Sequence, residues 1–328
     1  MNRKQRQENS GGKQEKGRNR IMKYWIGIDG GGTKTALAAA DANGTVLAAR
    51  TAGGCSYQSL GVQAVVRLLQ QEIGALAQQT GLALTDCAGC CLGLPCCGEN
   101  PEIDRLIRSG LEAALSPLRL HLVNDVEVGW AGSLSGAAGV HIVSGTGSIA
   151  FGKSADGRSA RCGGWNEFYG DEGSCYWIGR QAMGLFSKEA DGRLPQGALY
   201  RIVRAELGLV RDFSFTEVIQ ERWAPRRDKV ASFQRYAYQA AGEGDEAAAG
   251  LYRAAARELA LLVRGVREKL GLLREETRVS YSGGLFQTGE LILTPLRLEV
   301  EAQGGVLRPP ERTATEGALL LARERFPA

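Results

Sequence analysis

The sequence from Tyr24 to Thr35 reads YWIGIDGGGTKT. Its apolar first half is typical of a buried strand, and Asp29 and three glycines follow directly. A second apolar run begins at Thr35, and the Asn43-Gly44 pair behind it is a strong signal for a two-residue hairpin turn, because both positions tolerate a positive φ. The segment therefore predicts a strand, a glycine loop and two further strands.

The glycine loop has two interpretations. It is neither a P-loop, because the required spacing is absent, nor a dinucleotide-binding loop, because a strand follows it instead of a helix. A ligand-free hairpin is the simpler alternative, but a tight turn needs only one or two glycines. Gly31 and Gly32 would let backbone N–H groups approach phosphate oxygens, and Thr33 and Lys34 add a hydroxyl and a positive charge. We favour a phosphate-binding loop.

The same order of features returns in the second half of the chain. An apolar run from Val140 to Ser144 leads into Gly145-Thr146-Gly147-Ser148, and a second run and an Asp156-Gly157 pair follow. The segment 145–150 formally matches Gly-x-Gly-x-x-Ala, but a strand continues where the dinucleotide-binding pattern requires a helix. We therefore expect a duplicated architecture in which two glycine hairpins face each other and hold a polyphosphate.

The remaining periodicity predicts a mixed α/β protein with two sheets, each beginning with a glycine hairpin. The length of 328 residues is sufficient for roughly two domains. Predicted strands cover 24–29, 35–40, 45–50, 87–94, 119–124, 140–144, 149–153, 158–162 and 278–282. Predicted helices cover 59–79, 103–115, 313–325 and the segment capped by Asp245 and Gly271.

Two carboxylates lie where catalysis is expected. Asp125 follows the predicted strand 119–124, at the edge where α/β sheets usually bind ligands. Alone it could be a helix N-cap, but a phosphoryl acceptor also needs a carboxylate to take its proton. Asp29, beside the first glycine loop, could then hold magnesium through water. Together the two carboxylates favour the catalytic interpretation.

The segment from Cys162 to Ser174 looks like a binding loop. It has too many polar residues and glycines for a core element and too many aromatic residues for a linker. Trp165 beside the acidic Asp171 is suited to stacking on a sugar ring and accepting hydrogen bonds from its hydroxyls, although a Trp lid over the core is the alternative. His121 and His141 stand alone on predicted strands, so we expect packing or edge roles for them.

Charge and composition argue against nucleic acid as a partner. The net charge is +4, but residues 1–20 hold seven Lys/Arg and two Asp/Glu, which leaves the rest of the chain at −1. We expect residues 1–21 to form a disordered basic tail, and Met22 is a candidate alternative start. No apolar run is long enough to span a membrane and no signal peptide is evident, so we expect a cytoplasmic protein without membrane contact.

Five of the eight cysteines gather between Cys87 and Cys97. The Cys87-x-x-Cys90 spacing permits zinc or an iron-sulfur cluster, but neither a second well-spaced pair nor a nearby histidine completes four ligands. We favour a buried strand in which cysteine acts as a small apolar residue.

The motifs, in their order along residues 22 to 326, resemble the N-acetylglucosamine kinase family. That family lies within the BadF/BadG/BcrA/BcrD-type ATPases of the sugar kinase, actin and heat-shock chaperone superfamily. The motifs that carry the resemblance are Asp29-Gly-Gly-Gly-Thr-Lys-Thr, Asn124-Asp125, Ser144-Gly-Thr-Gly-Ser148, Gly163-Gly-Trp165, Gly170-Asp171-Glu172-Gly173 and Ser282-Gly283-Gly284.

The resemblance implies two actin-like, ribonuclease-H-like α/β lobes with ATP and magnesium in the cleft between them. We expect an N-terminal lobe from residues 22–118 and 313–328, to which the final helix returns, and a C-terminal lobe from residues 119–312. The resemblance also suggests a homodimer.

By the same resemblance, the site residues have separate tasks. Asp125 would be the base for a sugar hydroxyl. The phosphates would be held by Gly31, Gly32, Thr33, Lys34, Thr146 and Gly147, the adenosine by Gly283 and Gly284, and the sugar by Ser148, Trp165 and Asp171. Ser56 would also contact the sugar, at a position where the family often has Asn. Because Ser lacks the amide, the acceptor stays open among N-acetylglucosamine, N-acetylmuramic acid, glucosamine and other hexoses.

A rival function within the superfamily is an iron-sulfur activator ATPase of a dehydratase or reductase. Such proteins carry a cluster-ligating Cys after a glycine-rich segment of the second lobe, whereas Ser148 follows Gly145-Thr146-Gly147 here. A non-catalytic assembly ATPase would give Asp125 no hydroxyl to deprotonate. The sequence therefore favours an ATP-dependent amino-sugar kinase.

Overall fold

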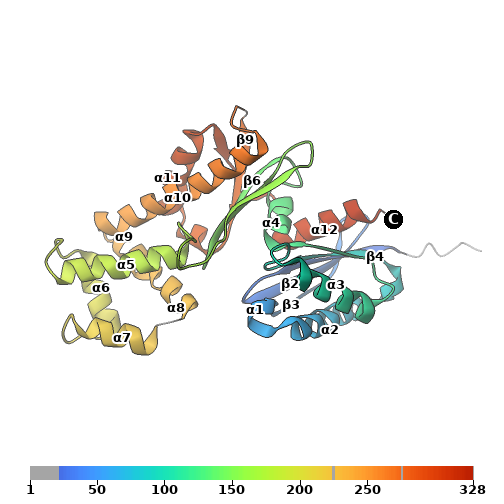
Figure 1. Cartoon of the computed structure of the whole chain (residues 1–328), viewed down its shortest axis with the longest axis horizontal. Coiled ribbons are helices and arrows are strands. Elements are labelled where there is room, and N and C mark those ends of the chain that lie inside the picture. Colours follow the sequence, from blue (N-terminus) through green and yellow to red (C-terminus); the bar gives the residue numbers. More distant parts are fainter. Residues whose placement is uncertain (1–21, 224–225, 275, 328) are drawn as a thin grey trace, which may run out of the picture.

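The computed structural model describes residues 22–223, 226–274 and 276–327. The basic tail predicted for residues 1–21 lies outside them. The described chain forms two lobes, each with a five-stranded sheet and helices packed against it (Figure 1). The predicted α/β class with two sheets is confirmed.

The first sheet has the strand order β3-β2-β1-β4-β5. Its antiparallel strands are β1 (Tyr24–Gly30), β2 (Lys34–Asp41) and β3 (Val46–Gly53), and β4 (Cys87–Leu94) and β5 (Leu120–Asn124) run parallel to β1. The turn after β2 is longer than the predicted two residues, and of the Asn43-Gly44 pair only Gly44 has a positive φ. The Asp41 carboxylate closes this turn by accepting hydrogen bonds from the amides of Asn43 and Thr45.

β5 requires a correction of the predicted lobe boundary. We expected the second lobe to begin at residue 119, but β5 pairs in parallel with β4, from Cys90 opposite Leu120 to Leu94 opposite Asn124. The strand therefore belongs to the first sheet. Apolar patterning identified the strand correctly, but it does not say which sheet a strand joins, because that depends on how the intervening helix crosses over the sheet.

The second sheet repeats the topology of the first. Its order is β10-β9-β6-β7-β8, so β6 takes the place of β1, β7 and β8 are the antiparallel partners, and β9 and β10 are the parallel ones. The strands are β6 (Gly139–Ser144), β7 (Ser148–Lys153), β8 (Ser159–Gly163), β9 (Thr277–Ser282) and β10 (Gly305–Leu307). The predicted duplication is confirmed at the level of topology, and only the three-residue β10 was not predicted.

The cysteines of β4 are structural. All eight residues of this strand are buried, and Cys90 and Cys91 pack into different apolar clusters on the two faces of the sheet. Burial raises the pKa of the Cys87 thiol to about 12, so the thiol stays protonated. Among the described residues, no group of three or more His, Cys, Asp or Glu side chains is placed to hold a metal ion. The prediction of a buried strand is confirmed.

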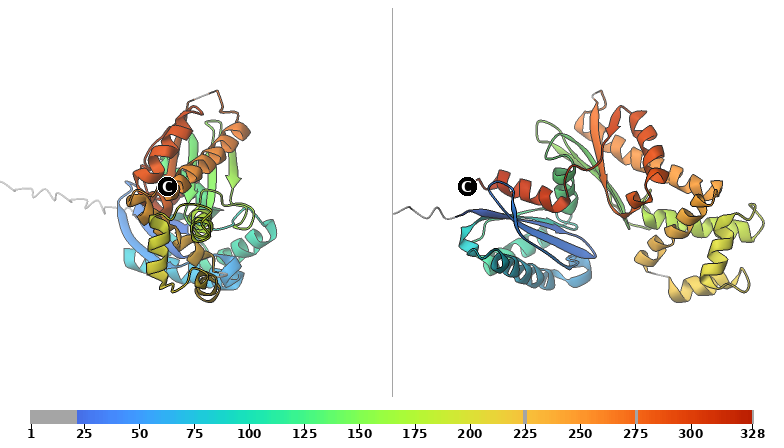
Figure 2. Two further views of the ribbon diagram at one scale, coloured as in Figure 1. Left: turned by 90° about the vertical axis from the view of Figure 1, so that its left-hand side faces the viewer. Right: turned by 180° about the vertical axis from the view of Figure 1, so that it is seen from behind.

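The helices pack around these sheets, as two further views show (Figure 2). Next to the first sheet lie α1 (Tyr57–Leu60), α2 (Val62–Thr80), α3 (Pro101–Leu115), α4 (Asp125–Ser133), α12 (Ala314–Arg325) and the 3₁₀ turn η1 (Leu84–Asp86). The second lobe contains α5 (Cys175–Ala190), α6 (Ala198–Leu207), α7 (Ser214–Arg222), α8 (Arg227–Ser232), α9 (Gln234–Gly242), α10 (Glu246–Leu270), α11 (Glu290–Glu301) and the 3₁₀ turn η2 (Gly284–Thr288). None of the described helices combines the length and apolar character needed to cross a membrane.

The last helix, α12, packs against β1 and α4, and glycines allow its backbone to approach theirs closely. A Cβ on Gly27 would lie 2.6 Å from the amide nitrogen of Leu319. A Cβ on Gly317 would overlap the carbonyl oxygen of Val128 and the amide of Gly132. Because no larger residue fits these positions without movement of backbone, the glycines set the distance between α12, α4 and the first sheet.

The replacement Gly317→Ala tests this close packing. Overlap with the backbone of α4 is expected to lower the free energy of unfolding by about 1–3 kcal/mol. Gly74→Ala is the matched control, because Gly74 also lies in a helix but has open space at its Cβ position; there the change is expected to be neutral or to stabilise by up to about 1 kcal/mol. Urea denaturation followed by circular dichroism measures both, and equal stability of the two variants would contradict the assignment.

Candidate active site

Asp125 is the first residue of α4 and directly follows the carboxyl end of β5. The N-cap of α4 is its neighbour Asn124, whose side-chain oxygen accepts a hydrogen bond from the amide of Val126 and whose side-chain amide donates to Cys97 O at 2.7 Å. The cap interpretation left open for Asp125 is therefore wrong. Asn124 fills that role and leaves the Asp125 carboxylate available for chemistry.

Asp125 and Asp29 influence each other electrostatically. Asp29 lies in β1 and Asp125 follows β5, and because these strands are parallel, their carboxyl ends meet at one edge of the sheet. Burial and the charge of Asp29 raise the pKa of Asp125 to about 6. Burial also raises the pKa of Asp29, and the positive charge of the nearby Lys34 partly offsets this rise. Two carboxylates in this arrangement attract a proton or a cation.

The first glycine hairpin lies next to Asp29 and is open to solvent. The Gly31 amide donates to Lys34 O at 2.9 Å, and Gly32 and Thr33 form the exposed tip. Gly32 has no positive φ, and a Cβ there would meet nothing within 4 Å. The fold of the described chain therefore gives no steric reason for glycine at this position. A ligand that approaches the backbone would give one.

Residues 53–56 support this hairpin from behind. The Cys55 amide donates to Gly31 O at 3.0 Å, and a Cβ on Gly54 would overlap the backbone of Gly32. The charges of Asp125 and Asp29 both reach the Cys55 thiol and contribute to its raised pKa, of which burial is the largest cause. Ser56, predicted to contact the sugar, is the next residue and is mostly buried. The structure thus brings Ser56 to the same edge as the two carboxylates.

The second hairpin is fixed to the start of α5. The Gly145 amide donates to Gly147 O at 2.9 Å, and Gly145 O accepts from the Cys175 amide at 2.8 Å. Thr146 forms the exposed tip, while Ser148 is buried and its hydroxyl donates to Glu172 O at 2.6 Å. The predicted phosphate residue Thr146 is therefore accessible, whereas the Ser148 hydroxyl already has a backbone partner.

Gly283 and Gly284 lie beside this second hairpin, since β9 and β6 are parallel neighbours. Gly283 is required by the fold, because its φ is 111° and a Cβ there would overlap Ser144 O. Gly284 has no positive φ and open space at its Cβ position, like Gly32. The structure therefore brings the predicted adenosine and phosphate residues of the second lobe together and leaves Gly284 accessible.

The predicted sugar loop contains one buried acid and several exposed rings. Asp171 is 3% exposed and has a φ of 56°. Trp165 is 74% exposed, and Phe168 and Tyr169 are exposed to a similar degree. A Trp lid over the core is thereby excluded, because the Trp165 ring faces solvent. Asp171 pairs with Arg227 of α8, a residue that no local motif in the sequence singled out.

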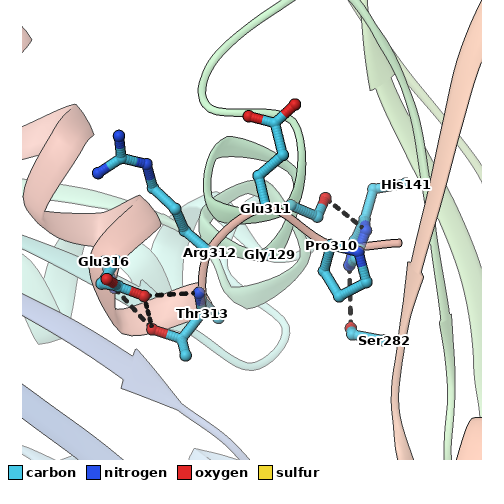
Figure 3. Close-up of a pocket in the computed structure, with 10 residues that line it drawn as sticks. Gly129, His141, Ser282, Pro310, Glu311, Arg312, Thr313 and Glu316 are labelled. Atoms are coloured by element: carbon cyan, nitrogen blue, oxygen red, sulfur yellow. Dashed lines mark hydrogen bonds between the residues drawn. The ribbon is translucent and has the colours of Figure 1, made fainter. Parts of the chain in front are cut away.

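A cavity of about 340 Å³ lies where the two lobes join, between α4, β6, β9 and the segment before α12 (Figure 3). His141 is fully buried in its wall, with Nδ1 at 2.8 Å from Ser133 Oγ and Nε2 at 2.9 Å from Ser282 Oγ. Burial lowers the pKa of His141 to about 3, so the ring is neutral. The expected packing role of His141 is confirmed, and the ring connects α4 to the residue before Gly283.

A second cavity, of about 370 Å³, lies against Asn124 on the other side of the junction. Two ion pairs cross the junction near it: Lys153 Nζ lies 2.6 Å from Glu127 Oε1, and Arg161 Nη1 lies 2.9 Å from Glu99 Oε1. Both pairs join the second sheet to the first lobe or to α4. The neighbourhood of Asp125 is therefore held from both lobes.

Two lobes of matching topology, with carboxylates and glycine hairpins at the strand ends, define a two-lobed phosphoryl-transfer protein of the actin-like type. The chain belongs to the BadF/BadG/BcrA/BcrD ATPase family, whose profile matches residues 26–322. The predicted family is thereby confirmed.

Named relatives extend over most of the chain. The N-acetylmuramic acid/N-acetylglucosamine kinase of Clostridium acetobutylicum is 32% identical over 265 residues, which are 80% of this chain and 86% of the relative. The N-acetyl-D-glucosamine kinase of Dictyostelium discoideum is 31% identical over 271 residues, which are 79% of this chain and 84% of the relative.

Among solved structures, a Chromobacterium violaceum protein provisionally named N-acetylglucosamine kinase superposes with a TM-score of 0.73 at 26% identity. The match covers 92% of this chain and 99% of that one. The predicted two-lobed fold is confirmed. The cytoplasmic location, the homodimer and the absence of nucleic-acid binding stay predictions.

Asp125→Asn is expected to stabilise the fold in a pH-dependent way. The folded-state pKa of about 6 lies above the usual value for Asp, so ionisation destabilises the folded protein above that pH. At pH 8, without nucleotide or Mg²⁺, the variant is expected to gain roughly 1–3 kcal/mol in the free energy of unfolding. At pH 4, where the acid is protonated in the folded state and only about half ionised in the unfolded state, the gain should fall to about 0.5 kcal/mol or less.

Denaturation at the two pH values measures this difference. The exposed Asp191→Asn at the end of α5 is the control; it removes only a surface pair with Arg193 and should gain no stability at pH 8. A loss of stability in Asp125→Asn at pH 8 would show that burial and repulsion from Asp29 do not destabilise the ionised carboxylate.

Proposed function

We propose that this protein is an ATP-dependent kinase that phosphorylates a hydroxyl group of an N-acetylhexosamine such as N-acetylglucosamine. The family and the names of the relatives support a sugar kinase. The observation that carries the proposal is the Asp125 carboxylate, which is freed from capping by Asn124 and has a pKa of about 6. A base with this pKa is ionised at neutral pH and still accepts a proton readily.

In the proposed reaction, the sugar hydroxyl gives its proton to Asp125 while its oxygen attacks the γ-phosphorus of ATP. The new bond between the sugar oxygen and phosphorus forms as the bond to the bridging oxygen of ADP breaks. The base must therefore lie beside the phosphates, and Asp125 shares the strand-end edge with Asp29 and the first hairpin. Proximity of these groups would supply much of the rate enhancement.

The two hairpins are the proposed phosphate contacts. The exposed tips at Gly32-Thr33 and Thr146 present amides and hydroxyls, and the Lys34 ammonium adds positive charge. Gly284 has open space at its Cβ position, and we propose that the adenosine lies against its backbone. Backbone amides suit phosphate oxygens because they donate hydrogen bonds without a side chain that would obstruct the ligand.

The proposal also implies Mg²⁺ with the nucleotide, and Asp29 is the residue that would hold it, through water. Asp29 fits this role because it is a partly buried carboxylate beside a second one, and no hydrogen bond to its side chain occurs within the described part of the chain. When bound, the ion offsets the negative charge of the phosphates.

The proposed sugar contacts are Ser56, Ser148, Trp165 and Asp171. Trp165 offers an exposed ring on which a sugar face can stack. The Asp171 carboxylate is 3% exposed and already accepts from Arg227 and the Ser148 amide, but each of its oxygens keeps a lone pair for a sugar hydroxyl. No observation favours the iron-sulfur activator, since the cysteines of β4 are buried and no metal-binding group of side chains is found among the described residues.

An ADP-release assay with ATP, Mg²⁺ and a panel of sugars tests the function. The panel contains N-acetylglucosamine, N-acetylmuramic acid, glucosamine and glucose, and product is identified by mass spectrometry as the sugar phosphate. We expect an N-acetylhexosamine to give the highest kcat/KM. Release of ADP at the same rate with and without any sugar would refute the kinase assignment.

Asp125→Asn is expected to lower kcat by at least roughly 100-fold while nucleotide and sugar binding persist, because the amide cannot accept the proton. The kcat/KM of the unchanged enzyme is expected to fall below pH 6, where Asp125 becomes protonated. Asp191→Asn again serves as control and should retain full turnover. Near-normal kcat in the Asp125 variant would show that another group is the base.

A further inference from the structure

Arg227, the first residue of α8, holds two acids of the predicted sugar loop. Its guanidinium donates a hydrogen bond to Asp171 Oδ2, and its Nε lies 3.4 Å from Glu167 Oε2. Asp171 is almost fully buried, whereas the Arg227 side chain is partly exposed. An arginine between two carboxylates can hold both at once because its donors are arranged in a planar fork.

The other oxygen of the Asp171 carboxylate reaches the second phosphate hairpin. Oδ1 accepts a hydrogen bond from the Ser148 amide at 3.3 Å. A Cβ on Gly147 would lie 2.9 Å from Oδ2 and would overlap the Arg227 guanidinium. The absence of a side chain at Gly147 therefore makes room for the Asp171–Arg227 pair. This packing is a structural reason for glycine at this position, in addition to the predicted contact with phosphate.

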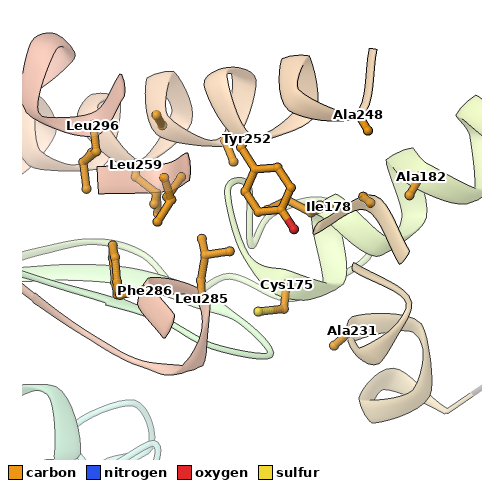
Figure 4. Close-up of a cluster of buried hydrophobic side chains, with 14 of the residues drawn as sticks. Cys175, Ile178, Ala182, Ala231, Ala248, Tyr252, Leu259, Leu285, Phe286 and Leu296 are labelled. Carbon is orange, nitrogen blue, oxygen red and sulfur yellow. The ribbon is translucent and has the colours of Figure 1, made fainter. Parts of the chain in front are cut away.

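The position of Arg227 is fixed by the packing of α8 against α5. A Cβ on Gly179 of α5 would overlap the carbonyl oxygen of Val230, so the two helices touch through their backbones. Ala231 is buried and faces the start of α5 near Cys175 (Figure 4). The Cys175 amide in turn donates to Gly145 O. Arg227 is thus connected to the hairpin by two routes, one through Asp171 and the other through α8 and α5. α8 lies on the side of the second lobe that faces α1 (Figure 1).

We propose that Arg227 is a positioning residue that couples sugar binding to nucleotide binding, by fixing the Asp171 carboxylate between the sugar loop and the Gly145–Ser148 hairpin. This inference rests on the proposed function. A sugar that binds Asp171 would then also fix the position of the Ser148 amide, which donates a hydrogen bond to Asp171. In the same way, a phosphate that orders the hairpin would order the Asp171 carboxylate. Such coupling is reciprocal: each ligand tightens the other by the same factor.

The coupling factor is measured by isothermal titration of adenylyl imidodiphosphate with Mg²⁺, with and without a saturating concentration of the best sugar of the panel. For the unchanged protein we expect the sugar to tighten nucleotide binding by about 5-fold or more, within the usual range for coupled sites. In Arg227→Gln the factor is expected to fall below about 2, and the KM for sugar to rise at least about 10-fold, while nucleotide affinity without sugar stays nearly unchanged.

Two further variants separate positioning from folding. Arg227→Lys keeps the charge and the helix but cannot hold both carboxylates in the same way, so it should restore only part of the coupling, even if Arg227→Gln unfolds. Arg226→Gln is the matched control, because Arg226 pairs only with the exposed Asp228 among the described residues and should behave like the unchanged protein.

The outcomes distinguish this inference from the function beneath it. A protein that phosphorylates a sugar but shows no coupling, or retains full coupling in the folded Arg227 variants, overturns the role of Arg227 and leaves the kinase intact. A protein that transfers phosphate to no sugar refutes the function itself.

Discussion

The contact between α12 and α4 is the constraint on which the placement of the site depends. Gly317 and Gly132 let the two helix backbones touch, and Gly27 brings α12 onto β1. α4 is the helix that begins with Asp125, so the height of Asp125 above the sheet edge follows from this close approach. Helix packing of ordinary side chains separates axes by 8–10 Å, and a larger residue at these positions would move Asp125 away from Asp29.

The two lobes share a topology, but the buried acids at their strand ends differ in whether an arginine pairs with them. In the first lobe, no arginine of the described chain pairs with Asp29 or Asp125; burial raises both pKa values, and the charge of Asp29 adds to the rise at Asp125. In the second lobe, Asp171 pairs with Arg227, which opposes the rise in pKa that burial causes. The unpaired acids are suited to take up a proton or a cation, whereas the paired acid is suited to hold a fixed position. In the proposed function, the first lobe supplies the reactive carboxylates and the second lobe supplies a carboxylate that positions the sugar.

Local sequence signals predicted what depends on local geometry. The glycine hairpins, the β4 cysteines and the caps of α10 follow from turn chemistry and periodicity, and the structure confirms them. The sheet joined by β5 and the partner of Asp171 depend on contacts between distant segments. Arg227 lies 56 residues from Asp171 in a polar stretch without periodicity, so no local pattern distinguishes it from a solvated arginine. The packing of Gly147 against Asp171 and Arg227 is hidden in the sequence for the same reason, because these residues come together only in the fold.

The junction of the lobes sets which parts of the site can move. α4 contacts the first sheet through β4 and the second through β6, β7 and β9, and the neutral His141 joins Ser133 of α4 to Ser282 of β9. Because Asp125 is the first residue of α4, its position depends on both sheets, whereas each glycine hairpin joins two strands of a single sheet. If the lobes close on a bound nucleotide, its phosphates would meet a proposed base whose helix already contacts both lobes, which would reduce the reorganisation needed at the reacting oxygen.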